Sequence, residues 1–136
     1  MKIVIIDDNK TVLLVNQLML KKEGFIKDGD VLVTYPDIDT FYKENENAIE
    51  LIDVIICDYD LGKNTLDGLK FLKNVRENGF LGECILLTGD DSFVMKTKMQ
   101  LQKNIHYILK NSEKSKSSTI SQLGKIIENY RNSISN

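Results

Sequence analysis

The sequence is poor in the residues and runs that mark secreted, membrane and nucleic-acid-binding proteins. It has two cysteines, Cys57 and Cys84, each within or beside an apolar run, and we expect both to be buried thiols in the cytoplasm. No apolar run approaches the roughly 18 residues that cross a bilayer, so no membrane role is expected. The 18 Lys+Arg against 20 Asp+Glu give a net charge of -2, which argues against direct nucleic-acid binding.

What the sequence does contain is a regular alternation of short apolar runs and segments with helical periodicity. A chain of 136 residues is long enough to form one domain with its own core. The apolar runs predict strands at 2–6, 30–35, 53–57, 83–88 and 106–109. The remaining segments predict helices at 10–24, about 38–52, 67–79, about 91–104 and roughly 118–132. This alternation predicts one α/β domain over residues 1–136, with helices on both faces of a parallel five-stranded sheet.

Apolar spacing assigns a buried face to three of these helices. The expected faces are Val12, Val15, Leu18 and Met19 in the first helix, Leu69, Leu72, Val75 and Arg76 in the third, and Ile120, Leu123, Ile127 and Tyr130 in the fifth. Asp67 is the expected N-cap of the third helix, and Gly24 and Gly79 are expected where the first and third helices end. Gly124, inside the fifth helix, is expected to cost about 1 kcal/mol relative to alanine.

Polar residues collect where the predicted strands end. Asp7 and Asp8 follow the first strand, Asp58 follows the third, Thr88 ends the fourth and Lys110 follows the fifth. The carboxyl ends of the strands form the ligand-binding edge of an open α/β sheet, so these side chains are expected to share a cleft. Binding of Mg2+ is the simplest way to offset the repulsion among three crowded carboxylates. Thr88 and Lys110 would then complete a site for a phosphoryl group.

Four motifs at these strand ends give the sequence a family resemblance over about residues 2–131. "VIIDDN", "VIICDYDL" with "DGL", "CILLTGDD" and "YILK" occur in this order. Together they resemble the response-regulator receiver family, and in particular its single-domain chemotaxis-type members. The resemblance implies a flavodoxin-like doubly wound (βα)5 fold with strand order 2-1-3-4-5. One departure is Asn111, which follows Lys110 where the family usually has proline.

The resemblance implies roles for the acidic residues of the predicted site. Asp58 would be the phosphoacceptor, at the end of a buried strand whose rigid backbone holds the carboxylate in place. Asp7, Asp8 and Asp58, with the backbone carbonyl of Asp60, would bind Mg2+. Asp7 and Asp8 have a simpler explanation as helix caps, but a cap needs only one acid.

The polar residues of the last two strands are implied to respond to the phosphoryl group. Thr88 would turn its hydroxyl toward it, Lys110 would supply a positive charge, and Thr88 and Tyr107 would form the switch. Tyr107 is explained equally well as a half-buried packing residue. His106, the only histidine, is expected to be an exposed strand residue, because a phosphorelay histidine is expected on a helix.

The implied function is a phosphorylation-controlled signalling switch that works with Mg2+. Asp58 would receive a phosphoryl group from a sensor histidine kinase or a histidine phosphotransfer protein. The chain would catalyse this transfer and its own dephosphorylation without being an enzyme in the usual sense. The added charge would reorganise the face formed by the fourth helix, fifth strand and fifth helix, where a downstream target that the sequence does not identify would bind.

Two other functions fit parts of the sequence. Asp58 and Asp60 form the D-x-D pattern of a haloacid-dehalogenase-like phosphohydrolase, which needs a further acidic metal-binding motif after the lysine. Beyond Lys110 the only acids are Glu113 and Glu128, and they form no such motif. An unphosphorylated interaction module would keep the fold alone and would be expected to lack a site residue. All five strand-end residues are present, which favours the switch.

Overall fold

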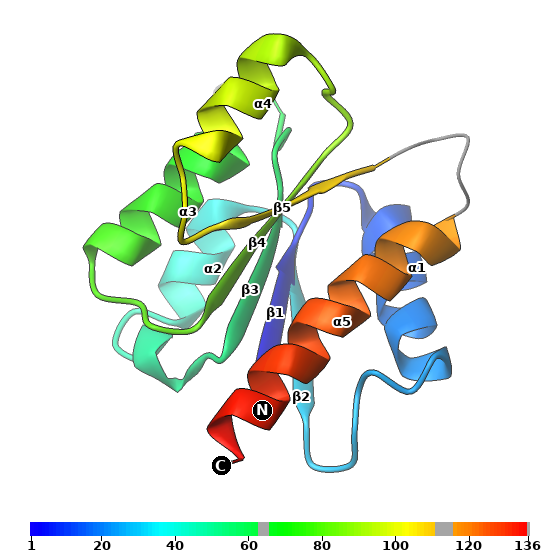
Figure 1. The fold of residues 1–136 in the computed structure, drawn as a ribbon. Coiled ribbons are helices and arrows are strands. Elements are labelled where there is room, and N and C mark those ends of the chain that lie inside the picture. The colour runs from blue at the N-terminus through cyan, green and yellow to red at the C-terminus, as the bar shows by residue number, and fades with distance from the viewer. Residues whose placement is uncertain (63–65, 111–115, 136) are drawn as a thin grey trace.

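Five parallel strands form one sheet in the order β2-β1-β3-β4-β5 in the computed structural model, which describes residues 1–62, 66–110 and 116–135 (Figure 1). The strands are β1 (Lys2–Ile6), β2 (Val31–Tyr35), β3 (Val54–Asp58), β4 (Glu83–Thr88) and β5 (His106–Leu109). The helices are α1 (Lys10–Lys22), α2 (Ile38–Glu44), α3 (Gly68–Glu77), α4 (Phe93–Gln100) and α5 (Lys116–Ile134), with a short 3-10 helix, η1 (Ile49–Leu51). The predicted doubly wound α/β fold and its strand order are confirmed.

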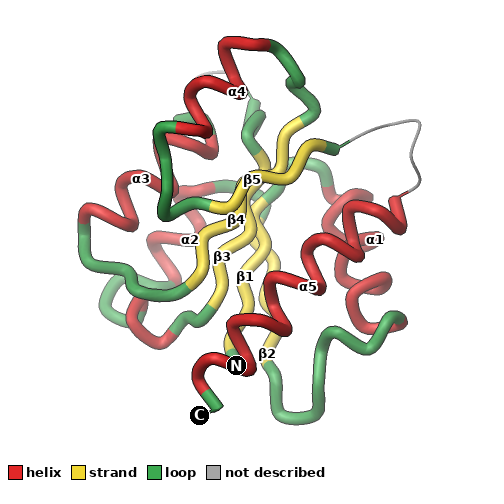
Figure 2. Tube along the Cα trace, in the orientation of Figure 1, coloured by secondary structure: helices red, strands yellow, loops and turns green. Residues whose placement is uncertain are grey.

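The sheet separates two apolar layers, because successive residues of a strand point to opposite faces. Ile3 and Ile5 of β1 belong to the core beneath α1 and α5, whereas Val4 and Ile6 belong to the core beneath α2, α3 and α4. Figure 2 shows α1 and α5 on one side of the strands and α2 and α3 on the other. All five residues of β3 are buried, so this central strand ends on a rigidly supported Asp58.

Helix α1 buries a different face from the one that its apolar spacing predicts. Its buried residues are Leu13 and Leu20, whereas Leu18 is 56% exposed and Val12, Val15 and Met19 are half-buried. The predicted face comprises Val12, Val15, Leu18 and Met19. Apolar residues surround most of this helix, so spacing alone does not select a face. Packing against the sheet and α5 selects it instead.

The predicted caps of α1 and α3 are confirmed. Asp67 accepts a hydrogen bond from the backbone N–H of Lys70 at 2.8 Å and so caps the amino end of α3. Gly24 and Gly79 follow the last turns of α1 and α3 with φ of 78° and 92°, the left-handed conformation that glycine adopts most readily. Arg76, predicted on the inner face of α3, is half-buried and donates to the carbonyl oxygens of Phe80 and Asn104.

The second helix is shorter than the predicted segment 38–52. α2 ends at Glu44, and turns lead from there to η1. The side-chain amide of buried Asn45 donates to the carbonyl oxygen of Phe41 at 2.8 Å and to the hydroxyl of Tyr35 at 3.1 Å. The first bond gives the carbonyl oxygen of Phe41, in α2, a hydrogen-bond donor, and the second ties the end of this helix to β2.

Two further helices differ from prediction in length. α4 spans Phe93–Gln100, so it begins later and ends earlier than the predicted 91–104. Ser92 sets its start by accepting a hydrogen bond from the backbone N–H of Met95 at 3.2 Å. α5 begins at Lys116 and ends at Ile134, two residues beyond each predicted bound. Its predicted inner face is confirmed, since Ile120, Leu123 and Ile127 are buried and Tyr130 is half-buried.

Gly124 of α5 has a packing role that the sequence does not reveal. A Cβ atom at this position would lie 2.3 Å from ring carbons of Phe25, in the segment that follows α1. Real Cβ atoms do not approach other atoms so closely, so the ring requires glycine at this point of the helix. Glycine lowers stability in a helix interior, but here it allows Phe25 to pack closely against α5.

Two further expectations concern burial. Cys57 and Cys84 are buried free thiols, as predicted. His106 is an exposed residue of β5, also as predicted, and it forms an ion pair with Glu83 of the neighbouring strand when protonated. None of the helices in the described part of the chain is both long and apolar enough to span a bilayer.

Candidate functional site

A cleft of about 540 Å³ opens at the carboxyl ends of the strands. Each of β1, β3, β4 and β5 contributes side chains to it from the residues at or just beyond its end. The predicted site residues that line this cleft are Asp7, Asp8, Asp58, Asp60, Thr88 and Lys110. Tyr107, three residues before Lys110, is half-buried beside this cleft and is not among its lining residues.

Asp7, Asp8 and Asp58 form a compact acidic cluster. Each offers a carboxylate oxygen, and these three oxygens lie within 4.8 Å of one another. Asp7 is 3% exposed and Asp58 is 6% exposed, whereas Asp8 is exposed to solvent. Burial, together with the nearby charge of Asp58, raises the pKa of Asp7 to about 6, although the backbone N–H of Asn9 donates to its carboxylate at 2.9 Å. The cluster therefore holds more negative charge than its hydrogen bonds compensate.

Lys110 is the cation of the cleft. Its ammonium group lies 2.5 Å from Oδ1 of Asp58, and its backbone N–H donates to the carbonyl oxygen of Thr88 at 2.7 Å. The second bond extends the pairing of β4 and β5 by one residue and aims the lysine at β3. Burial raises the pKa of Asp58, while the hydrogen bond from Lys110 lowers it, and the net shift is upward. Asn111, the departure noted after this lysine, lies outside the described residues.

The donor set of the cluster fits a hard divalent cation. Mg2+ prefers oxygen ligands and is usually held by one or two carboxylates, with waters completing its shell. Asp7 and Asp8 supply such oxygens, and Asp58 retains Oδ2 because Lys110 occupies Oδ1. The raised pKa of Asp7 also indicates a site where a cation would relieve repulsion. Asp60 lines the same cleft, and its carboxylate accepts from the backbone N–H of Gly62 at 3.2 Å.

Gly68 fixes the strand end that carries Asp58, a role that the "DGL" motif does not reveal. A Cβ atom at this first residue of α3 would lie 2.1 Å from the carbonyl oxygen of Asp58. The backbone N–H of Gly68 donates to the carbonyl oxygen of Tyr59 at 2.8 Å. Glycine thus allows the amino end of α3 to rest directly on the backbone of residues 58 and 59. The only hint in the sequence is a glycine directly after an N-cap.

The backbone of Asp90 links the two predicted switch residues. Its N–H donates to the hydroxyl oxygen of Thr88 at 3.0 Å, and its carbonyl oxygen accepts from the hydroxyl of Tyr107 over a long 3.4 Å. Thr88 is 3% exposed, and because its oxygen accepts from Asp90, its own proton is available to another acceptor. Sequence reasoning missed this link, since backbone groups leave no pattern in the residue types.

Comparisons with known proteins agree with this geometry. The family model described as response regulator receiver domain matches residues 3–121. A receiver domain protein from Clostridium thermocellum is 25% identical with a TM-score of 0.70, and the match covers 98% of this chain and 96% of that one. No curated protein matches the sequence.

Two more distant structures show the same fold. The chemotaxis response regulator CheY4 of Vibrio cholerae is 19% identical with a TM-score of 0.68, over 93% of this chain and 97% of its own. The isolated receiver domain of RcsB from Salmonella enterica serovar Typhimurium, solved with the phosphomimetic BeF3-, is 19% identical with a TM-score of 0.67, over 96% and 97%.

Proposed function

The chain belongs to the response regulator receiver family, and we propose that Asp58 is its phosphoacceptor. Members of this family are phosphorylation-controlled switches of two-component signalling, and this chain is such a switch. One observation supports the choice of Asp58. It ends a fully buried strand with an ammonium group 2.5 Å away and with two further carboxylates in the same cluster. In this proposal the receiver domain spans residues 1–136.

Receiver domains bind Mg2+ at an acidic pocket, and in this chain Asp7, Asp8 and Asp58 are its side-chain ligands. The backbone carbonyl of Asp60 is the proposed fourth protein ligand. When bound, the cation neutralises the carboxylates and the phosphoryl oxygens that approach them. Asp7 is expected to be ionised in that state, because a neighbouring cation lowers the pKa of a carboxyl group.

The phosphoryl group comes from a phosphohistidine. Receiver domains are phosphorylated by histidine kinases or histidine phosphotransfer proteins, and one of these two classes is the proposed donor here. An oxygen of Asp58 attacks the phosphorus atom, the phosphorus–nitrogen bond breaks, and the imidazole takes up a proton as it leaves. Lys110 then balances charge on the phosphoryl oxygens. The chain assists transfer by positioning groups, and receiver domains are generally not enzymes in the usual sense.

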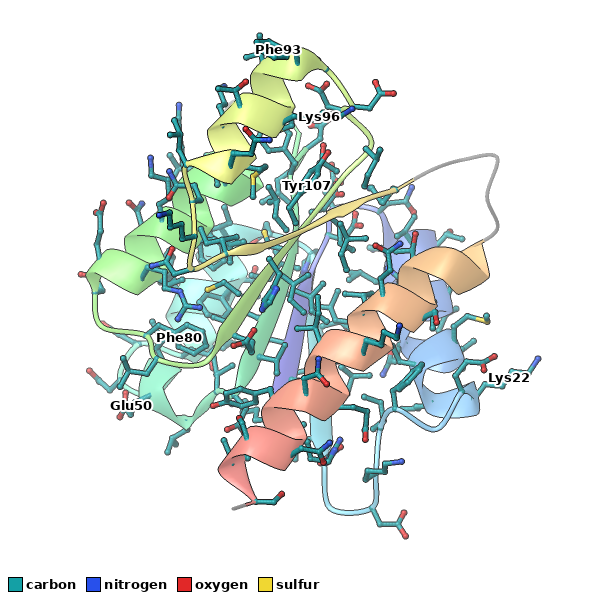
Figure 3. All side chains as sticks on the ribbon, viewed as in Figure 1. Lys22, Glu50, Phe80, Phe93, Lys96 and Tyr107 are labelled. Atoms are coloured by element: carbon teal, nitrogen blue, oxygen red, sulfur yellow. The ribbon has the colours of Figure 1, made fainter. Side chains whose placement is uncertain are left out.

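The proposed switch begins at Thr88. If its hydroxyl turns to donate to the phosphoryl group, it gives up the hydrogen bond that it now accepts from Asp90. Asp90 is also the partner of Tyr107, so the loop between β4 and α4 and the tyrosine are released together. Phe93 and Val94 of α4 are 83% and 62% exposed, and Figure 3 shows Phe93 directed away from the molecule. These apolar side chains support the α4–β5–α5 face as the binding surface for the downstream target.

A small phosphodonor tests the assignment of Asp58. Incubation with acetyl phosphate and Mg2+ should add one phosphoryl group by intact mass, and Asp58→Asn should abolish the addition. EDTA should abolish it in the wild type. Asp28→Asn, in an exposed loop, is the matched control and should be labelled as the wild type is. Unchanged labelling of Asp58→Asn would place the acceptor elsewhere and refute the assignment.

A further inference from the structure

A second hollow of about 240 Å³ lies between α3 and α4. We name it the α3–α4 groove; the residues that matter below are Tyr59, Leu69, Lys70, Lys73, Lys98 and Leu101. Tyr59 lines both this groove and the cleft of Asp58, so the two hollows share one wall. The groove has no part in the phosphoryl chemistry proposed above.

Three lysines surround the groove. Lys70 and Lys73 lie one turn apart on α3, and Lys98 faces them from α4. All three are exposed, and within the described part of the chain none of their ammonium groups forms an ion pair. Asp67 also lines the groove, but its carboxylate caps α3. This concentration of unpaired positive charge occurs in a chain whose net charge is -2.

Part of the surface between the lysines is apolar, beside the polar side chain of Gln102. Leu101, just after α4, is 74% exposed at the groove, and Leu69 and the ring of Tyr59 form part of its floor. Leu101, the ring of Tyr59 and the three lysines all line this one hollow. Cations around an apolar floor match a ligand that combines carboxylates with an apolar side chain.

We propose that the α3–α4 groove binds an acidic peptide segment of a partner protein, with a large apolar side chain of that segment seated on Leu101 and Tyr59. Charge complementarity favours such a segment. A small phosphate ligand is held best by fixed, converging donors such as an arginine fork or free helix N–H groups. Lysines are flexible point charges, and the carboxylate of Asp67 already accepts from the amino end of α3. The groove therefore suits a row of carboxylates better than one compact anion.

Fluorescence anisotropy with a designed peptide tests this proposal on the whole chain. The probe is a labelled peptide of alternating aspartate and glutamate around a central phenylalanine–leucine pair, measured at low ionic strength. The triple variant Lys70→Gln, Lys73→Gln and Lys98→Gln should weaken binding at least about tenfold, the combined effect of three exposed ion pairs. All three positions are exposed, so the fold is retained, and melting curves check this.

A matched variant separates the groove from general charge attraction. Lys10→Gln, Lys21→Gln and Lys22→Gln remove the same charge from exposed positions on α1 and should change binding less than about twofold. Equal losses in the two triple variants would overturn the proposal. Absence of any anisotropy change with the wild type would do so too.

The apolar contact is tested by a second pair of variants. Leu101→Ser should weaken binding of the peptide about fivefold, whereas Leu81→Ser, at a 92% exposed position before β4, should leave it unchanged. Replacing the phenylalanine–leucine pair of the probe by serine should cause a similar loss. Equal binding of the serine probe, or displacement of the peptide by a lower concentration of ATP, would show that the groove recognises charge or a nucleotide rather than an acidic peptide.

Discussion

Two aspartates at opposite ends of the sheet both have little exposed surface but have opposite electrostatic surroundings. Asp30, just before β2, accepts hydrogen bonds from both terminal nitrogens of Arg131, at 2.6 and 3.0 Å, and its side chain is 3% exposed. Asp7, just after β1, is buried as a whole residue, but its charged neighbours include Asp8 and Asp58. The hydrogen bonds from Arg131 hold the pKa of Asp30 well below its usual range, whereas burial raises the pKa of Asp7 to about 6.

The difference separates the part of the molecule that stabilises the fold from the part that we propose binds a cation. At the amino ends of the strands, Asp30 ties the segment before β2 to α5 through Arg131, over 101 positions of sequence. At the carboxyl ends, the raised pKa of Asp7 indicates a poorly compensated charge, and we expect the cluster to lower the stability of the metal-free fold. Such a cost is typical of a site that a cation and a charged group will occupy, because the groups are held ready for the ligand.

Asp30→Asn should have the largest effect, because it removes the carboxylate that pairs with Arg131 and stabilises the fold. The variant leaves the guanidinium of Arg131 without its main anionic partner, and we expect the free energy of unfolding to fall by about 3 kcal/mol. Urea denaturation measures the loss. Glu128→Gln, which removes the more exposed partner of Arg131 at 3.3 Å, is the control and should cost less than about 0.5 kcal/mol. Similar small losses in both variants would remove the distinction between the two ends.

Asp7→Asn should act in the opposite direction. In EDTA at pH 7 we expect the free energy of unfolding to rise by about 1–2 kcal/mol, because a poorly compensated charge is removed and the hydrogen bond from Asn9 has an amide oxygen to accept it. Asp58→Asn should give a smaller gain, since it also removes the ion pair between Asp58 and Lys110. A destabilised Asp7→Asn would contradict the picture of crowded like charges.

Mg2+ should stabilise the protein only through the acidic cluster at the carboxyl ends of the strands. At ten times its Kd, Mg2+ is expected to stabilise the wild type by about 1.4 kcal/mol. Asp7→Asn should gain clearly less, whereas Asp30→Asn should gain as much as the wild type from its lower starting point. Thermal melting of the three proteins with and without Mg2+ provides the data. An equal gain in all three would place the cation outside the acidic cluster.

The pH dependence should show the smallest effect. The pKa of Asp7 is about 6 in the folded protein and 3.8 as an ordinary value, so between these the folded state binds more protons. Asp7 therefore contributes to the free energy of unfolding at low pH, and this contribution is lost as the pH rises through about 6. From pH 7 to pH 5 the metal-free wild type should therefore gain about 1 kcal/mol in urea denaturation, and Asp7→Asn should gain less. A profile that Asp7→Asn leaves unchanged would assign the titration to another group.

Much of the site could be predicted because parallel strands bring their carboxyl ends together. Asp7, Asp58 and Lys110 each follow an apolar run directly and Asp8 is next to Asp7, so finding the strands also located the cleft. The pair of Asp30 and Arg131 could not be predicted in this way. These residues are far apart in the sequence, and neither stands in a pattern that distinguishes it from a solvated surface charge.

The fold was predictable to the level of element type and order, and less so in detail. Strand runs are short and bounded by polar residues, which leaves little freedom in placing them. The inner face of α1 was wrong because apolar residues occur nearly all round that helix, so the neighbouring elements decide which are buried. The end of α2 was wrong because it depends on a bond between the side chain of Asn45 and the hydroxyl of Tyr35, a tertiary contact.

The contact between Gly124 and Phe25 carries a warning for protein engineering. Replacing a helical glycine by alanine is among the first substitutions chosen to raise thermostability, and propensity scales would select Gly124 before any other position in α5. Here the added methyl group would meet the phenyl ring at 2.3 Å. A designer who wants a more robust version of this chain should therefore keep this glycine and phenylalanine together, and treat them as one two-residue unit when grafting α5 onto another scaffold.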